Sequence, residues 1–196
     1  MLTSSCLIPK VHNFEHACNV TLNVYKLLSR IASEKVNLTA NQRSLGAITD
    51  PLTDFACVFA ALIHDCDHEG VPNIQLAKEH PEMAQFYHSK ALAEQNSVDV
   101  AWFLWMCPQY RELRETICAN EEEMRMLRQL VVNIVIATDI CDKDLKDFRN
   151  KRWEKHFSEE SKDPDEYGNR LATIGIEHII QASDVSHTMQ PWQVYT

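Results

Sequence analysis

Three apolar segments of the sequence repeat hydrophobic residues every three or four positions, which is the period of an α-helix. The repeating positions are Val20, Val24, Leu27, Leu28 and Ile31; Phe55, Phe59, Leu62 and Ile63; and Leu127, Leu130, Val131, Ile134 and Val135. Alternating patterns bounded by tight-turn dipeptides, which would indicate strands, are hard to find, and only four glycines occur. The sequence therefore predicts an all-α fold.

Turn-forming residues divide this helical pattern. Loops are expected over residues 37–51, around Gly70, at Cys107 and Pro108, and over residues 158–168. Asp50 or Thr53 is expected to cap the helix that follows the first loop. One further helical stretch is expected over residues 83–95.

The size and charge of the chain limit its class. With 196 residues and 45% hydrophobic content, it is expected to form a single domain over residues 1–196. A net charge of −9 disfavours nucleic-acid polymers and anionic membranes as partners, but allows a small anionic substrate where cations are supplied locally. No signal pattern or membrane-spanning run is seen. Seven scattered cysteines without a C-x-x-C pair favour a reducing, cytoplasmic location.

The segment AALIHDCDHEGVPN, residues 60–73, places five ionisable side chains directly after an apolar run. Burying charge costs free energy unless an opposite charge lies nearby. A divalent cation would favour the neutral imidazole of His64 and the ionised carboxylate of Asp65. The alternative is a helix end at which both residues are polar terminators. His68, four residues after His64, is expected on the same side.

Other candidates are weaker when taken singly. His12 and His16 stand four apart ahead of a helical pattern, so one helix face would carry both rings, but such pairs are more often ordinary surface or core histidines. Asp139 and Asp184 each follow an apolar stretch, and each is either a helix cap or an oxygen ligand from a distant helix. Glu94 by itself is expected at the surface.

Four segments together resemble the catalytic domain of class I cyclic nucleotide phosphodiesterases, which belong to the HD-type metal-dependent phosphohydrolases. In order, they are VHNFEHACNV (residues 11–20), HDCDHEGVPN (64–73), ATDIC (137–141) and ASDVSHTMQPW (182–192). The resemblance extends from about residue 10 to residue 195, which is nearly the whole chain. It implies an all-helical catalytic domain.

The resemblance also implies two divalent metal ions, usually Zn²⁺ at the first site and Mg²⁺ or Mn²⁺ at the second. The positions that match ligands of the first ion are His16, His64, Asp65 and Asp184, and Asp65 would also bridge to the second ion. The positions that match the surroundings of the second ion are His68, Glu94, Thr138 and Asp139. His12 matches the general acid, and Asn73 and His187 match positions near the substrate.

The implied reaction is hydrolysis of cyclic AMP or cyclic GMP to the 5′-monophosphate, in cyclic-nucleotide signal transduction. A hydroxide shared by the two ions would attack the cyclic phosphate, and His12 would protonate the leaving 3′-oxygen. Two alternatives stay open. One is an HD-type phosphohydrolase with a different substrate, and the other is a non-catalytic domain that binds metal.

The sequence departs from the family pattern at several positions: Val11, Asn19, Asn96, Ser97 and His187. His187 stands where several relatives have an asparagine that faces the base. The family's domain normally starts several helices before the first motif and continues to a glutamine and an aromatic clamp that hold the purine. The chain is therefore expected to be part of that domain, truncated at both ends, and to belong to a larger regulatory protein.

Overall fold

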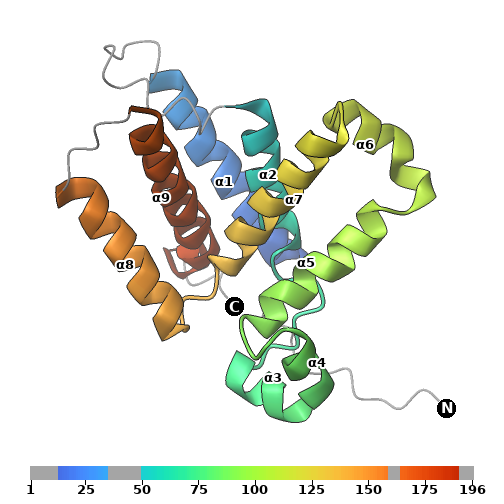
Figure 1. The fold of residues 1–196 in the computed structure, drawn as a ribbon. Coiled ribbons are helices and arrows are strands. Elements are labelled where there is room, and N and C mark those ends of the chain that lie inside the picture. Colours follow the sequence, from blue (N-terminus) through green and yellow to red (C-terminus); the bar gives the residue numbers. More distant parts are fainter. Residues whose placement is uncertain (1–12, 35–49, 159–163, 190–196) are drawn as a thin grey trace.

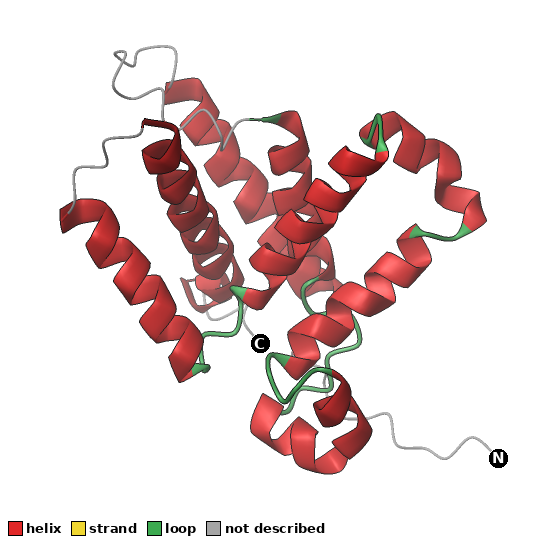
Figure 2. Ribbon diagram, viewed as in Figure 1, coloured by secondary structure: helices red, strands yellow, loops and turns green. Residues whose placement is uncertain are grey.

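The computed structural model describes residues 13–34, 50–158 and 164–189 of the chain (Figure 1). Every regular element in these ranges is a helix, as the colouring of Figure 2 shows. The longer helices are α1 (Phe14–Glu34), α2 (Pro51–Ile63), α5 (Leu92–Trp105), α7 (Glu121–Ile136), α8 (Lys143–Ser158) and α9 (Pro164–Asp184). The short elements are α3 (Asn73–Glu79), α4 (Pro81–Phe86), η3 (Pro108–Tyr110), α6 (Arg111–Ile117) and η4 (Val185–Met189). The prediction of an all-α fold is confirmed.

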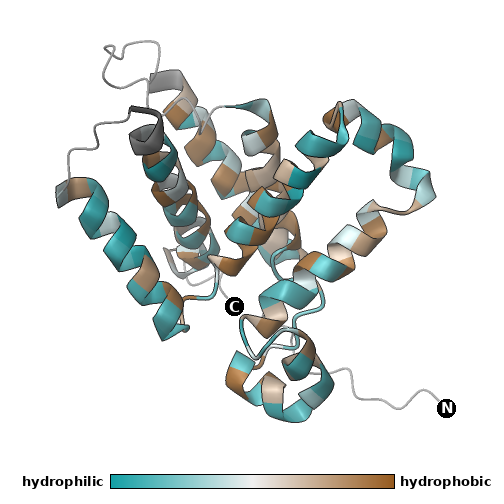
Figure 3. Ribbon diagram, in the orientation of Figure 1, coloured by the Kyte–Doolittle hydropathy of each residue, from teal (hydrophilic) through white to brown (hydrophobic). Residues whose placement is uncertain are grey.

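Helix α2 lies at the centre of the main core. It packs between α1 and α7, α1 also packs against α9, and α8 covers the outer side of α9 (Figure 1). Apolar positions of α1, α2, α7 and α9 meet there, whereas α8 is largely hydrophilic along its length (Figure 3). The most deeply buried core side chains include Val20, Val24, Leu127, Val131, Val135 and Ile180. The helices that carry the three predicted repeats therefore supply most of this core, although Leu27 and Leu62 of those repeats are exposed.

A second, smaller apolar cluster lies under α3, α4 and the start of α5. Leu76, Leu92 and Ala93 are buried in it, and Met83 and Tyr87 pack against them. This cluster joins the two short helices to α5, beside the main core. It therefore fixes the segment between Pro72 and Ala93, which carries the predicted site residue Asn73 and ends next to Glu94.

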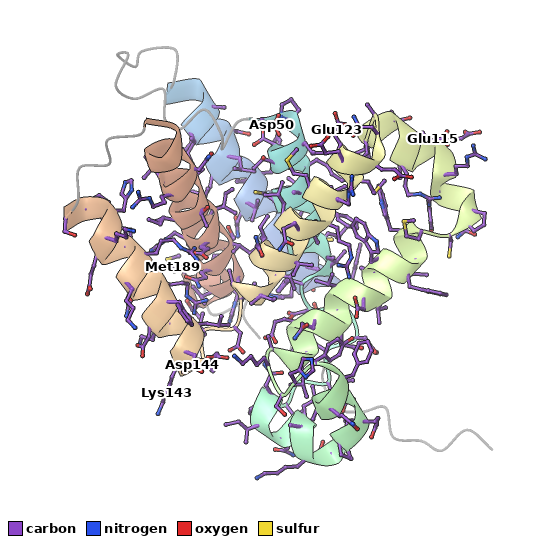
Figure 4. The ribbon with its side chains drawn as sticks, in the orientation of Figure 1. Asp50, Glu115, Glu123, Lys143, Asp144 and Met189 are labelled. Atoms are coloured by element: carbon purple, nitrogen blue, oxygen red, sulfur yellow. The ribbon has the colours of Figure 1, made fainter. Side chains whose placement is uncertain are left out.

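Polar caps define where two of the core helices begin. The side chain of Asp50 accepts a hydrogen bond from the Thr53 backbone N–H at 3.1 Å, and Figure 4 labels Asp50 at the start of α2. Asn120 caps α7 by accepting from the backbone N–H groups of Glu122 and Glu123. Both side chains satisfy helix N–H groups that have no partner within the helix. The expected cap before α2 is therefore Asp50.

The expected helix over residues 83–95 is interrupted. Helix α4 ends at Phe86 and α5 begins at Leu92, and between them His88, Ser89 and Ala91 have φ angles of 54°, 56° and 41°. Left-handed backbone costs about 1–2 kcal/mol per residue outside glycine, so a helix cannot continue through this segment. The break places Glu94 in the first turn of α5, not near the end of a longer helix.

The expected loop over residues 158–168 is also too long. Helix α9 already begins at Pro164, because proline fits the first turn of a helix, where its missing N–H is not needed. Gly168 lies within this helix and is buried. The loop predicted over residues 37–51 falls mostly outside the described residues. Among the helices that the structure describes, none has the length and apolar character needed to span a membrane.

Candidate metal centre

Four polar side chains from three helices converge at one end of the main core. His16 lies in the first turns of α1, His64 and Asp65 follow the last residue of α2, and Asp184 ends α9. The His16 Nε2 atom lies 3.0 Å from Asp184 Oδ1 and 3.5 Å from Asp65 Oδ2. The His64 Nε2 atom lies 3.1 Å from Asp65 Oδ2 and 3.4 Å from Asp184 Oδ1. Two imidazole nitrogens thus face the same two carboxylates.

The His64 ring is fixed by the end of α2. Its Nδ1 atom lies 2.9 Å from the backbone oxygen of Ala61, so Nδ1 carries a proton and donates it to that carbonyl. The side chain is almost fully buried, and Nε2 has no partner with hydrogen-bond geometry among the described residues. In the neutral ring, Nε2 therefore presents its lone pair to the carboxylates. Metal-binding histidines commonly hold their second ring nitrogen in this way.

The residues that follow α9, in η4, contact α1 next to the centre. The Asn23 side chain on α1 donates a hydrogen bond to Ser186 Oγ at 2.7 Å. His187 Nδ1 lies 2.9 Å from the Asp184 backbone oxygen, and the His187 ring lies edge-on to the His16 ring, with centroids 5.6 Å apart. These contacts hold the turn after α9 against α1, and with it the carboxylate of Asp184. Figure 4 labels Met189 at the end of this turn.

The centre carries strongly perturbed charges when no metal is bound. Burial by itself would lower the pKa of His64, but its interactions with the carboxylates of Asp184 and Asp65 raise that pKa to about 10. Burial by itself would raise the pKa of Asp184, but its interactions with His16 and His64 lower that pKa to about 2. At neutral pH, a protonated His64 therefore supplies the positive charge between the carboxylates.

These donors fit a divalent cation. The ligand atoms of His16, His64 and Asp65 lie within 4.8 Å of one another, and Asp184 adds a carboxylate oxygen that contacts both rings. Two imidazole nitrogens and two carboxylate oxygens are a donor set that suits Zn²⁺ and other borderline ions. A cation here would replace the His64 proton and satisfy the buried Nε2 atom, so metal binding is expected to release a proton.

A second acidic group adjoins the first centre. Glu94 in α5 and Asp139 after α7 are both buried, and the Asn73 side chain donates hydrogen bonds to both, at 2.9 Å and 3.0 Å. Burial raises the pKa of Glu94, the hydrogen bond from Asn73 opposes this, and the charges of Asp139 and Asp65 add to the increase. The expectation that Glu94 is a surface residue is therefore wrong. The group joins three segments that lie far apart in the sequence.

Three other predicted site residues, His68, Thr138 and His12, are not among the side chains that converge at the metal centre in the described part of the chain. Helix α2 ends at Ile63, so a helical spacing does not carry His68 to the same face as His64; its Nδ1 atom accepts a hydrogen bond from the Gly70 backbone N–H. Thr138 donates its hydroxyl proton to the Val135 backbone oxygen, in the turn before Asp139. His12, the predicted general acid, lies outside the described residues. The roles of these residues at a metal or substrate stay predictions.

Sequence reasoning missed the contacts of Asn73 with Glu94 and Asp139, because they join residues that are 21 and 66 positions apart. It also missed the support that Asp139 receives from the turn before α8 and from α8 itself. Asp139 Oδ1 accepts from the backbone N–H groups of Cys141 and Asp142, and Arg149 donates to the Asp139 backbone oxygen at 3.1 Å. No local pattern marks Arg149 as a residue of the site.

The fold and the convergent side chains define an all-helical domain with a candidate divalent-metal centre. The model of the 3′5′-cyclic nucleotide phosphodiesterase family matches residues 11–196. The chain belongs to this family.

Two curated relatives come from Drosophila melanogaster. A 3′,5′-cyclic-AMP phosphodiesterase, isoform F, is 26% identical over 190 residues, which cover 94% of this chain and 26% of the fly protein. Isoforms N/G of that enzyme have the same identity, with 17% of their length covered. The chain therefore spans about a quarter or less of the length of these relatives.

A solved structure supports the fold. In the crystal structure of the phosphodiesterase domain of the RhoPDE fusion protein from the choanoflagellate Salpingoeca rosetta, the matched region has a TM-score of 0.68 and 21% sequence identity. The match covers 94% of this chain and 52% of the solved chain. The described helices therefore correspond to about half of that structure.

The shifted pKa values of His64 and Asp184 predict how the stability of the metal-free protein depends on pH. The folded-state pKa of His64 is about 10 against an ordinary 6.5, so its contribution is complete below about pH 6.5 and is lost as pH rises toward 10. The folded-state pKa of Asp184 is about 2 against an ordinary 3.8, so its contribution is lost as pH falls through that interval. The pair therefore contributes most between these two intervals.

Urea unfolding in EDTA, from pH 5 to pH 9.5, would measure this effect. The free energy of unfolding of the wild-type protein should fall more steeply above pH 6.5 than that of His64→Gln, in which the imidazole is absent. Equal slopes for the two proteins over this range would contradict the prediction. Saturating Zn²⁺ should reduce the slope, because the bound ion would hold His64 in its neutral form.

Proposed function

We propose that this chain forms the metal-binding part of a phosphodiesterase that hydrolyses 3′,5′-cyclic nucleotides to 5′-monophosphates, using two divalent ions. The observation that carries the proposal is the convergence of two imidazoles and two carboxylates in a member of this family. The fly relatives support cyclic AMP as a substrate, since they are named as cyclic-AMP phosphodiesterases. Such a function also suits a cytoplasmic protein.

Each group of residues has a task in this proposal. His16, His64, Asp65 and Asp184 would hold the first ion, while Glu94 and Asp139, together with Asp65, would surround the second. The ions would supply Lewis-acid chemistry, which activates water and offsets the negative charge that builds up at phosphorus. This would explain how a chain of net charge −9 accepts an anionic substrate.

Proton transfer completes the reaction. Hydrolysis forms one P–O bond to the oxygen of water and breaks the bond between phosphorus and the 3′-oxygen. That oxygen is a poor leaving group unless it gains a proton, and His12 is the proposed donor. His187 lies beside His16 through their ring contact and is the proposed residue for contact with the nucleotide.

An assay of the purified protein tests the proposal. Cyclic AMP and cyclic GMP are incubated separately with the protein, Zn²⁺ and Mg²⁺, and the products are separated so that 5′- and 3′-monophosphates are distinguished. Formation of the 5′-monophosphate, lost after chelation and restored by metal, is the expected result. A folded protein that binds metal but yields no product would reject the proposal and favour a non-catalytic, metal-binding domain.

A further inference from the structure

Asn73 uses its whole side chain in contacts with the protein. The carboxamide nitrogen donates to Glu94 Oε2 at 2.9 Å and to Asp139 Oδ2 at 3.0 Å, and the carboxamide oxygen accepts from the Ala93 backbone N–H at 2.9 Å. A primary amide has two N–H donors, and two carboxylates take both of them. A nucleotide could bind this amide nitrogen only by displacing one of these acidic side chains.

The same contacts join three separate parts of the fold. Asn73 is the first residue of α3, Glu94 lies in the first turn of α5, and Asp139 lies between α7 and α8. The second apolar cluster, which contains Leu76 and Leu92, holds α3 against α5. The position of Asn73 is therefore set by packing, and its amide transmits that position to the two carboxylates.

The two carboxylates need such a fixed donor between them. Glu94 and Asp139 are both buried, and the charge of Asp65 also acts on Glu94. Like charges in a buried site repel each other unless donors or a cation lie between them. Asp139 has donors on its other oxygen, Oδ1, from the backbone at Cys141 and Asp142. The Asn73 amide is the donor that the two acidic side chains share.

We propose that Asn73 is a positioning residue, which holds Glu94 and Asp139 beside Asp65 in the orientation that the second divalent ion requires. This rests on the proposed function, in which these carboxylates surround that ion. Asn73 would therefore act on the metal through its neighbours and would not contact the nucleotide. Residues that orient the groups around a metal typically change its affinity by about 10–100-fold when removed.

A purely structural role for Asn73 is the competing explanation. Its oxygen accepts from Ala93 N–H, which is one of the helix N–H groups at the start of α5 that lack a partner within the helix. The variant Asn73→Asp separates the two roles, because aspartate keeps an acceptor oxygen and the same shape, while a further negative charge, which repels Glu94 and Asp139, replaces both N–H donors. Asn73→Ala removes the acceptor and the donors together.

The test measures binding of Mn²⁺ and not turnover. Protein with one equivalent of Zn²⁺ is titrated with Mn²⁺, and the free ion is followed by electron paramagnetic resonance. The Kd for Mn²⁺ should rise about 10–100-fold in both Asn73 variants, while the Zn²⁺ content stays at the wild-type level. For turnover, kcat should fall and KM for the cyclic nucleotide should not change.

Gln75→Ala is the matched control. Gln75 is also on α3 and also has a side-chain amide, but that amide is exposed and, among the described residues, donates to Glu79 within the same helix. This variant should bind Mn²⁺ like the wild type. Thermal unfolding of all three variants shows whether each is folded.

The outcomes separate the two proposals. An unchanged Mn²⁺ affinity in a folded Asn73→Asp variant, or a higher KM with an unchanged kcat, would overturn the positioning role. Loss of folding in both Asn73 variants, with Gln75→Ala intact, would also overturn it, since Asn73 would then serve the fold alone. A wild-type protein without turnover would reject the proposed function, yet weaker Mn²⁺ binding in the variants would still support this inference.

Discussion

Substitution of Asp184 by asparagine is expected to remove the first metal ion and to abolish hydrolysis. The Asp184 carboxylate at the end of α9 lies 3.0 Å and 3.4 Å from the two histidine nitrogens, so it contacts both rings, as Asp65 does. Asparagine keeps the size of the side chain but carries no charge. Because even outer residues of a metal site change affinity by about 10–100-fold, loss of a direct ligand should cost more than 100-fold.

Metal analysis after dialysis, together with the cyclic-nucleotide assay, measures this effect. Asp147→Asn is the matched control, because Asp147 is exposed in the second turn of α8 and its loss changes the net charge equally. The control should keep both metal and activity. Wild-type metal content in Asp184→Asn would show that the site assignment is wrong.

Substitution of His12 by alanine is expected to reduce the rate while metal content stays at the wild-type level. The prediction follows from the match of His12 to the general acid of the family, and His12 lies outside the residues that the structure describes. A positioned acid or base typically contributes about 10²–10⁴-fold to a rate, so kcat should fall by a factor in that range. The variant therefore differs from Asp184→Asn, which should lose both rate and metal.

The pH dependence of kcat gives the second measurement for this variant. If His12 donates the proton, the wild-type rate should fall at high pH as the acid loses its proton, and this limb should be absent in His12→Ala. His88→Asn is a suitable control, since His88 is exposed and asparagine tolerates the left-handed backbone at that position. Equal rates in wild type and His12→Ala would exclude His12 as the acid.

The main helices could be predicted because most positions of their apolar repeats face the core, although Leu27 and Leu62 do not. Val20 and Val24 in α1, and Leu127 and Val131 in α7, are each at most 1% exposed, as the helical spacing requires. The break between α4 and α5 could not be predicted in this way. Residues 87–91 contain no glycine or proline, so the composition gives no sign of the left-handed angles there, where the Ser89 N–H closes a turn onto the Ala84 backbone oxygen at 2.8 Å.

The candidate site was only partly predictable for a similar reason. Neighbouring residues such as His64 and Asp65 can be recognised together, and an ordered set of motifs extends the group to His16 and Asp184. Glu94 carries no such local indication, and only the family resemblance matched it to the surroundings of the second ion; its neighbours Asn73 and Asp139 lie in other segments. Spacing along the sequence describes one helix at a time. The buried acidic group instead forms from three segments of the chain that only the folded structure brings together.

The contact between His16 and Asp184 has a consequence for how the protein is made. These residues are 168 positions apart, so the ribosome must synthesise α9 before the first centre can exist. Until then, His64 and Asp65 have only the partners that α1 and the intervening helices provide. Contacts between such distant residues form slowly, because most of the chain must first be ordered. Acquisition of metal at the first centre should therefore require that α9 has already been synthesised.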